Sequence, residues 1–201
     1  MKVASLILDF DGVIADTYKV YVDFLVKKLN FSQKKAENRM QKSSTEIIKR
    51  KKGLVNKILE KLYYHSFFKF LKNHQNLLFE ERMKEIQSIK LPKAILTRSY
   101  AHVCKFILED YFSDFELVVG KETTSNKVKG MELIFANPKF EPKSCLFITD
   151  TVADVVEVSK IFPKDQIFAV DWGFNQTELL EQHLPKNQIF HKDFSELLKL
   201  V

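Results

Sequence analysis

The sequence predicts an α/β protein with a doubly wound, Rossmann-like parallel sheet and a small all-helical cap domain. Two observations indicate this class. Short apolar runs alternate with segments of helical periodicity, and one long polar stretch interrupts the alternation. Strands that are buried on both faces of a parallel sheet typically show short apolar runs without polar alternation. Alternating strand and helix units imply helices on both faces of that sheet.

Five short apolar runs are the expected strands, because each is bounded by polar or turn residues and is too short for a helix. They are residues 3–8, 94–97, 116–119, 145–149 and 167–170. The expected core helices lie between and after these runs, where apolar side chains recur at helical spacing. They are residues 100–111, 128–135, 152–161, 177–184 and 194–200.

Residues 17–88 interrupt the alternation and predict a helical insertion after the first strand. The segment is rich in Lys, Glu, Gln and Asn, with one Gly and no Pro. We expect it to form the cap domain, with residues 1–16 and 89–201 forming the α/β core domain. Residues 17–85 hold 17 basic and 7 acidic side chains, which would attract anions. A solvated helical surface explains the same charge pattern.

The composition predicts a folded protein of a reducing compartment. With 201 residues, 45% of them hydrophobic, the chain can form a core and a smaller domain. No apolar run approaches the roughly 18 residues of a membrane span. Asp9 and Asp11 interrupt the apolar N-terminus before a signal peptide can form. Because Cys104 and Cys145 lie in apolar segments, they suit buried free thiols. We therefore expect a cytoplasmic protein without a membrane partner.

Three expected strands end at polar residues that can take part in chemistry. The first ends at Asp9, the second at Thr97 and the fourth at Asp150. Ligands of parallel α/β sheets bind beyond the carboxyl ends of the strands, so these residues should meet in one crevice. Asp11 and Asp154 would add carboxylates there, and two unit charges about 4 Å apart repel by about 4 kcal/mol at an effective dielectric near 20. Mg²⁺ would offset this repulsion and commonly shares its site with phosphate.

Residues 9–17, DFDGVIADT, resemble the first motif of the haloacid dehalogenase (HAD) superfamily, DxDGxxxDT. Taken singly, its DG and DT pairs are common turn and helix-cap dipeptides, but together they are specific. The resemblance extends from residue 3 to about 171, with the insertion matching only as a helical cap. It implies a HAD-type phosphatase. The other motifs match in order at Thr97, at Lys127, and at Thr149-Asp150-Thr151 with Asp154.

The resemblance implies a role for each residue of the crevice. Asp9 would be the nucleophile that forms an aspartyl-phosphate, and Asp11 would protonate the leaving oxygen and later deprotonate water. Thr97 and Lys127 would be catalytic through their contacts with the phosphoryl group. Mg²⁺ would be held by Asp9, by Asp11 through its backbone carbonyl, and by Asp150.

The phosphate-binding lysine has three candidates before the fourth strand. Lys121, Lys127 and Lys129 all follow the third strand, and Lys127 is favoured because it directly precedes the next expected helix, where free N–H groups attract phosphate. Arg98 would bind substrate or be an exposed loop residue. Asp154 would support the metal through water or hold the lysine.

The leading hypothesis is a Mg²⁺-dependent phosphomonoester hydrolase that acts on a small phosphorylated, anionic substrate. A phosphomutase of the same superfamily that acts on a sugar phosphate fits Asp9 and Asp11 equally. The alternative from another class is a polyanion- or partner-binding protein with vestigial catalysis, which would use Lys49 to Lys52 and the aromatic residues 63–70. We regard nucleic acid as the less expected partner, and the aromatic residues are expected to pack inside the cap.

Overall fold

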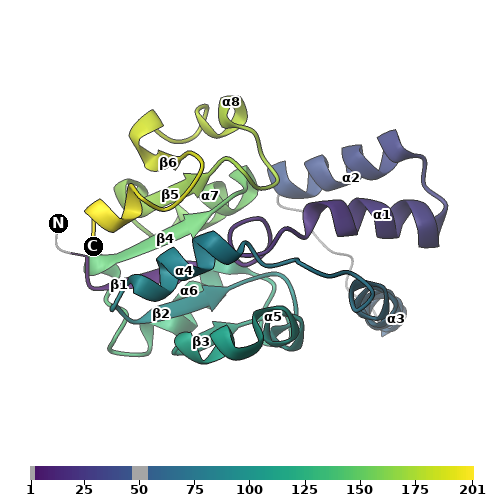
Figure 1. Ribbon diagram of the computed structural model, residues 1–201, viewed down its shortest axis with the longest axis horizontal. Helices are drawn as coiled ribbons and strands as arrows, with labels where there is room; N and C mark the ends of the chain where they lie inside the picture. Colours follow the sequence, from purple (N-terminus) through teal and green to yellow (C-terminus); the bar gives the residue numbers. More distant parts are fainter. Residues whose placement is uncertain (1–2, 47–53) are drawn as a thin grey trace.

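A six-stranded parallel sheet forms the centre of the molecule (Figure 1). The computed structural model describes residues 3–46 and 54–201. The strand order β3-β2-β1-β4-β5-β6 confirms the predicted doubly wound α/β fold. Strand β6 was not predicted, because two residues are too few to show a pattern. The bounds are Ser5–Leu8 (β1), Lys93–Leu96 (β2), Leu117–Val119 (β3), Cys145–Thr149 (β4), Ile167–Val170 (β5) and Ile189–Phe190 (β6).

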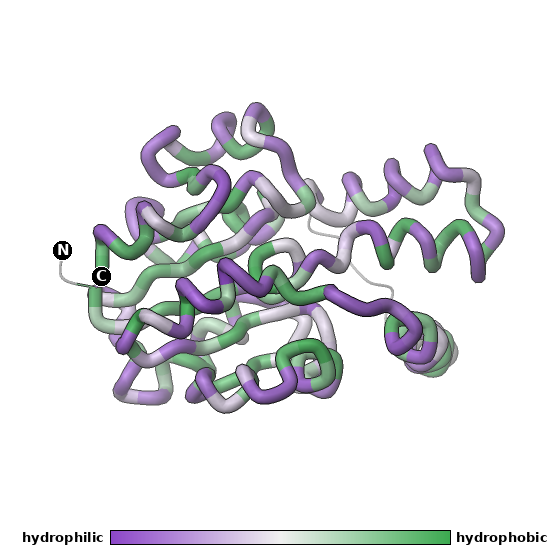
Figure 2. Tube along the Cα trace, in the orientation of Figure 1, coloured by the Kyte–Doolittle hydropathy of each residue, from purple (hydrophilic) through white to green (hydrophobic). Residues whose placement is uncertain are grey.

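Helices cover both faces of the sheet, whose strands form the apolar centre of the chain (Figure 2). Helices α4 (Glu80–Ser88) and α5 (Ala101–Leu108) pack on one face, where Leu6 and Leu8 of β1 point. Ile7 points to the other face, which is covered by α6 (Lys127–Phe135), α7 (Val152–Val158) and α8 (Thr177–Leu180). Alternate residues of one strand therefore belong to two separate hydrophobic clusters. Cys104 lies in the first cluster and Cys145 in the second, and both are buried free thiols.

Several helical segments are shorter or tighter than the sequence predicted. Helix α8 has one turn, and the expected C-terminal helix is a 3₁₀ turn. Pro185 follows closely after α8 and disfavours a helical conformation at the residue before it. The 3₁₀ segments are η1 (Glu109–Asp114), η2 (Pro142–Ser144), η3 (Lys164–Gln166), η4 (Lys186–Gln188) and η5 (Leu197–Lys199).

Three helices inserted after β1 lie beyond the carboxyl ends of the strands (Figure 1). They are α1 (Tyr18–Leu29), α2 (Gln33–Thr45) and α3 (Leu54–Leu71). Phe67 and Phe70 of α3 are buried against Phe24 of α1, which confirms the inward packing expected for the aromatic residues. We call these three helices the cap.

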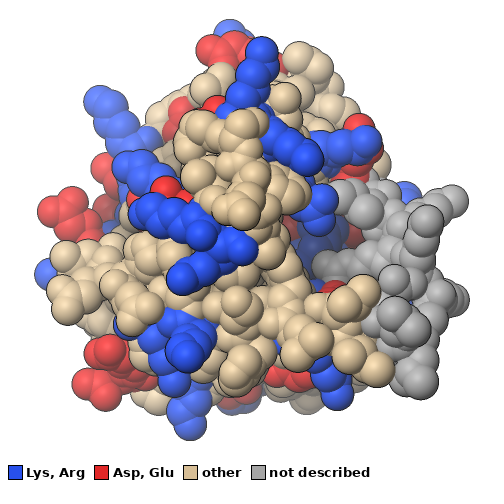
Figure 3. Space-filling view, turned by 90° about the vertical axis from the view of Figure 1, so that its right-hand side faces the viewer, with Lys and Arg blue, Asp and Glu red and all other residues tan. Residues whose placement is uncertain are grey.

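The outer surface of the cap end carries many basic side chains. Seen from this end, Lys and Arg side chains spread over the face, while Asp and Glu side chains lie mainly toward its edges (Figure 3). Attraction of anions and a solvated helical surface both account for this distribution. Lys49 to Lys52, the densest basic run of the sequence, lie outside the described residues.

The chain enters and leaves the cap through one narrow connection, which we call the neck. In it, Asp16 N–H donates to Leu77 O (2.7 Å) and Phe79 N–H donates to Ile14 O (3.0 Å). Between these bonds Ala15 pairs with Leu78 in an antiparallel bridge.

Helix α4 follows the neck and lies within the 17–88 range predicted for the cap domain, but its contacts are with the core. Its Met83 and Ile86 belong to the cluster of Leu6, and Glu85 accepts a hydrogen bond from Phe194 N–H (2.9 Å). The boundary at residue 88 stays a prediction. None of the described helices combines the length and apolar content needed to cross a bilayer.

Candidate active site

The polar residues predicted at the strand ends lie on three neighbouring strands. Asp9 follows β1, Thr97 follows β2 and Asp150 follows β4, and β1 pairs with both β2 and β4. All three side chains are buried. The structure therefore brings together the residues that the sequence placed in one crevice, at the edge of the sheet covered by the cap.

A tight turn after β1 packs closely against the side chain of Asp150. Gly12 has a φ of +77°, a left-handed conformation that favours glycine, and its N–H donates to Ala15 O (2.8 Å). A Cβ atom at Gly12 would overlap the Asp150 carboxylate, and so would one at Gly173. The glycines thus allow two backbone segments to approach one buried carboxylate.

Asp11 is held by three hydroxyl groups. Its Oδ1 accepts a hydrogen bond from Thr17 (2.8 Å), and its Oδ2 accepts one from Ser99 (2.6 Å) and a long one from Thr97 (3.4 Å). Burial raises the pKa of Asp11, while the hydrogen bonds from Ser99 and Thr17 act against the shift. A raised pKa suits a group that must carry a proton before it can donate one. Ser99 also lies 3.2 Å from the hydroxyl of Tyr21 on α1, so a cap residue reaches this cluster.

Of the three candidate lysines, Lys127 is the one whose ammonium contacts Asp9. Lys127 is 1% exposed, and its Nζ lies 3.0 Å from Asp9 Oδ1, 2.8 Å from Asp154 Oδ2 and 2.6 Å from the Leu96 carbonyl. Burial opposes its charged form, but the two carboxylates outweigh burial and raise the pKa of Lys127. Burial raises the pKa of Asp9 well above its usual range, and Lys127 acts against that shift. Lys129 is exposed on α6.

Lys127 lies at the N-terminus of α6, as the sequence predicted, but side chains bond to two of the N–H groups at this helix N-terminus. The backbone N–H of Lys127 donates to Glu157 Oε1 (2.8 Å), and the N–H of Lys129 donates to the side chain of Asn126 (2.8 Å). Since side chains already occupy these N–H groups, the ammonium is the group of Lys127 that faces Asp9.

Arg98 lies between two buried carboxylates. Its guanidinium forms an ion pair with Asp154 and a 2.7 Å hydrogen bond with Glu157. Burial alone would raise the pKa of Asp154, but Arg98 and Lys127 hold it well below its usual range. Asp154 therefore stays anionic and links Arg98 to Lys127. Glu157 has no motif signal, and only its helical spacing of three residues from Asp154 places it on the same face of α7.

Asp150 has one buried oxygen that fits a cation. Its Oδ2 accepts a hydrogen bond from Phe174 N–H (2.7 Å), whereas its Oδ1 is buried without a hydrogen-bond partner among the described residues. Burial raises the pKa of Asp150 to about 8. No group of three or more Asp, Glu, His or Cys side chains in the described parts of the chain is placed to hold a metal. Mg²⁺ fits such a site, because it uses one or two carboxylates and takes its other ligands from water and phosphate.

The loop after β5 ties this site to the cap. The Phe174 ring lies 5.3 Å from the ring of Tyr18 on α1, centroid to centroid. The side chain of Asn175 donates to Ser44 on α2 (2.7 Å) and accepts from Val152 N–H at the start of α7 (2.8 Å). Asn175 could not be predicted, because it is a single loop amide without a motif.

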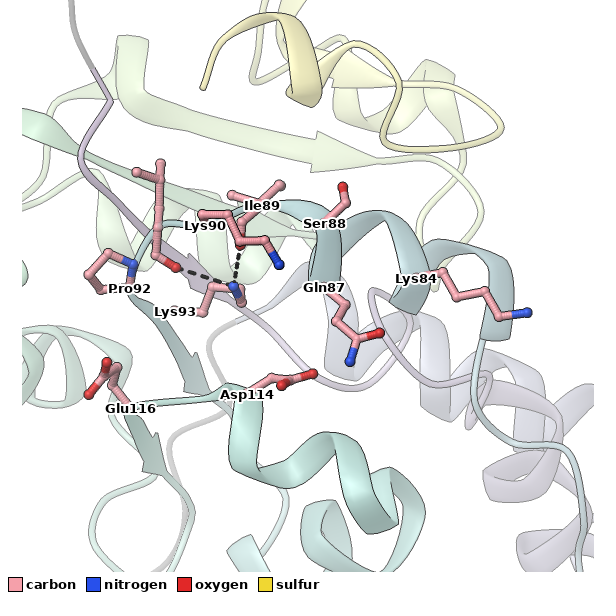
Figure 4. A pocket seen from close by; sticks show the side chains of 10 residues that line it. Lys84, Gln87, Ser88, Ile89, Lys90, Pro92, Lys93, Asp114 and Glu116 are labelled. Carbon is pink, nitrogen blue, oxygen red and sulfur yellow. Dashed lines mark hydrogen bonds between the residues drawn. The ribbon is translucent and has the colours of Figure 1, made fainter.

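A cavity of about 640 Å³ lies at the other edge of the sheet, where β2 begins (Figure 4). Lys93, which lines it, donates from Nζ to the carbonyls of Ile89 (2.6 Å) and Leu91 (3.2 Å). The residues of the three predicted strand ends do not line this cavity. It is therefore separate from the candidate active site.

Comparison with solved structures identifies the fold. No protein-family model and no curated protein sequence matches the chain. A haloacid dehalogenase-like family hydrolase from Streptococcus pneumoniae matches with a TM-score of 0.69 and 15% identity, over 98% of this chain and 97% of the other. A predicted phosphatase from Clostridium acetobutylicum matches with a TM-score of 0.67 and 16% identity, over 99% and 98%.

A third match is CbbY from Rhodobacter sphaeroides in complex with phosphate. It has a TM-score of 0.69 and 12% identity, and the match covers 97% of this chain and 96% of that one. Together these likenesses show that the chain has the haloacid dehalogenase-like hydrolase fold over nearly its full length.

Proposed function

We propose that this chain of haloacid dehalogenase-like fold is a Mg²⁺-dependent phosphomonoester hydrolase that acts through an aspartyl-phosphate on a small anionic phosphate ester. The observation that supports it best is the buried Asp9 carboxylate, 3.0 Å from the Lys127 ammonium, beside Asp150 with its unpartnered oxygen. A nucleophilic carboxylate, a cation for the phosphoryl oxygens and a place for a second cation are the parts that phosphoryl transfer needs.

In the first step, a carboxylate oxygen of Asp9 attacks phosphorus and the bond from phosphorus to the leaving oxygen breaks. Protonated Asp11 gives its proton to that oxygen, so the product leaves as a neutral alcohol. The hydroxyls of Thr17 and Ser99 fix the Asp11 carboxyl during the transfer. Thr97 and Lys127 donate hydrogen bonds to the phosphoryl oxygens.

In the second step, water attacks the aspartyl-phosphate. Asp11, now a carboxylate, takes a proton from the water as the new bond to phosphorus forms and the bond from Asp9 to phosphorus breaks. Inorganic phosphate leaves, and both carboxyl groups return to their starting states. The covalent step thus needs no group beyond the two aspartates, water and the cations that hold the phosphoryl oxygens.

Asp9, Asp150 and the backbone carbonyl of Asp11 would hold Mg²⁺. The Lys127 ammonium would supply a second positive charge to the phosphoryl group. The metal supplies positive charge that offsets the repulsion between the anionic nucleophile and the anionic ester. Asp154 positions Lys127, because its carboxylate contacts the lysine ammonium, and Arg98 in turn holds Asp154 and Glu157 through its guanidinium.

Release of inorganic phosphate tests the proposal. Simple phosphate esters should be hydrolysed with Mg²⁺ and not in excess chelator, and Asp9→Asn should lower the rate by at least about 10³-fold, since the amide cannot act as the nucleophile. The matched control is Asp165→Asn, an exposed aspartate outside the site, which should keep the wild-type rate.

Other outcomes identify the alternatives. Conversion of a hexose 1-phosphate to its 6-phosphate with little free phosphate would show a mutase. Inertness toward every ester, with salt-dependent binding of oligonucleotides that Asp9→Asn leaves unchanged, would refute the proposal and support a polyanion-binding protein.

A further inference from the structure

A second buried lysine lies beside the candidate active site and pairs with the cap. The side chain of Lys121, which follows β3, is 6% exposed. Its ammonium forms an ion pair with Glu60 of α3 and lies 3.4 Å from the centre of the Tyr64 ring on the same helix. The Tyr100 ring, from the loop after β2, lies 5.6 Å from the same ammonium. Two aromatic rings and one carboxylate therefore lie against this cation.

The backbone of Lys121 is hydrogen-bonded to the core. Its N–H donates to the carbonyl of Ser99 (2.8 Å), and the N–H of Thr97 donates to Val119 O (3.0 Å). The side chain of the next residue, Glu122, accepts from Ala101 N–H at the start of α5 (3.0 Å). These bonds join the loops after β2 and β3. Lys121 is therefore tied to the core loops beside Asp11 and Thr97, whereas Glu60 and Tyr64 belong to the cap.

Lys121 lies on the side of the site where a leaving group would lie. This step rests on the proposed function: attack by Asp9 sends the leaving oxygen away from Asp9, to within reach of Asp11. The Ser99 hydroxyl donates to Asp11, and the Ser99 carbonyl accepts from the backbone N–H of Lys121, so the Lys121 backbone lies next to this residue. The part of the substrate beyond the leaving oxygen would thus extend toward Lys121, Tyr64 and Tyr100.

We propose that Lys121 binds a second anionic group, a carboxylate or a phosphate, carried by the leaving group of the substrate, and that Glu60 takes its place when no substrate is bound. The pair in the structure is a charge-assisted contact in a buried site, which is the contact a substrate anion would make. Exchange of one carboxylate for another keeps the lysine paired throughout. Because Glu60 is on the cap, its displacement couples recognition of the substrate to cap position.

The test compares three esters that differ in the second group. Phosphoglycolate carries a carboxylate, ethylene glycol bisphosphate carries a second phosphate, and ethyl phosphate carries neither. Lys121→Met should raise KM for the esters with a second anion by about 10- to 100-fold, the range expected for one charge-assisted hydrogen bond. KM for ethyl phosphate should stay within about threefold of wild type, and its turnover also shows that the variant folds.

Glu60→Gln gives the opposite change on the same substrates. Removing the competing carboxylate should lower KM for phosphoglycolate or for the bisphosphate and leave ethyl phosphate unchanged. Whichever of the two responds more strongly to both substitutions identifies the second group. Lys129→Met, an exposed lysine on α6, is the matched control and should behave as wild type.

Two results would overturn the inference while leaving the proposed function intact. In one, Lys121→Met changes KM for all three esters by the same factor, which would make Lys121 and Glu60 only a latch for the cap. In the other, wild type hydrolyses ethyl phosphate as well as it does the two esters that carry a second anionic group. Failure to release phosphate from any ester would instead overturn the proposed function itself.

Discussion

Replacing Asp150 by Asn should stabilise the metal-free protein at high pH. Burial raises the pKa of Asp150 to about 8 in the folded chain, against an ordinary value of 3.8. Between these values the folded state holds a proton that the unfolded state has released, so the free energy of unfolding falls as pH rises. The slope is about 1.4 kcal/mol per pH unit, so the loss from pH 4 to pH 8 is on the order of 5 kcal/mol.

The Asn side chain avoids this loss because it never carries a charge. Its carbonyl oxygen can still accept the hydrogen bond that Phe174 N–H now gives to Asp150. Urea unfolding in excess chelator, from pH 4.5 to 8.5, measures the effect. The two proteins should be about equally stable at pH 4.5, and Asp150→Asn should be several kcal/mol more stable at pH 8.5.

The same two proteins are then compared with Mg²⁺ present. Millimolar Mg²⁺ at pH 8 should stabilise wild type, because only the folded state offers the paired carboxylates, and should leave Asp150→Asn unchanged. Asp165→Asn controls for the loss of a surface charge. A stability difference between Asp150→Asn and wild type that is constant from pH 4.5 to 8.5 would refute the reasoning.

Two further substitutions probe the neighbouring contacts. Lys127→Met leaves buried Asp9 without its cation, and urea unfolding at pH 7 should show a loss of about 3–5 kcal/mol, against less than about 0.5 for exposed Lys129→Met. Equal losses would contradict this. Ser99→Ala removes a hydrogen bond that lowers the pKa of Asp11, so the Asp11 limb of the pH–kcat profile should move to higher pH, with kcat about tenfold lower. An unmoved limb would count against Asp11 as the acid.

The sequence located the strand ends well because two local signals coincide there. A run of apolar residues shows a buried strand, and the polar residue that follows shows where it leaves the core. Asp9, Thr97 and Asp150 could be predicted in this way, and the strand order then places them side by side.

The residues that hold the site together have no such local signal. Ser99 contacts Asp11 across 88 positions of sequence, and Asn175 contacts Ser44 across 131. A single Ser or Asn in a loop is common on protein surfaces, so only the folded arrangement separates these two from the rest. The pair of Lys121 and Glu60 was missed for the same reason, since nothing in the sequence marks Glu60 until α3 packs beside the loop that follows β3.

The neck makes the cap an exchangeable part of the molecule. The chain departs at Asp16 and returns at Leu77, and these two residues are hydrogen-bonded to each other. An insert of any length whose ends meet at this spacing would leave the sheet, its order and the carboxylates at its edge as they are. If the proposed function holds, remodelling this one insert would vary what the protein recognises while Asp9, Asp11 and Asp150 keep their places at the ends of the strands.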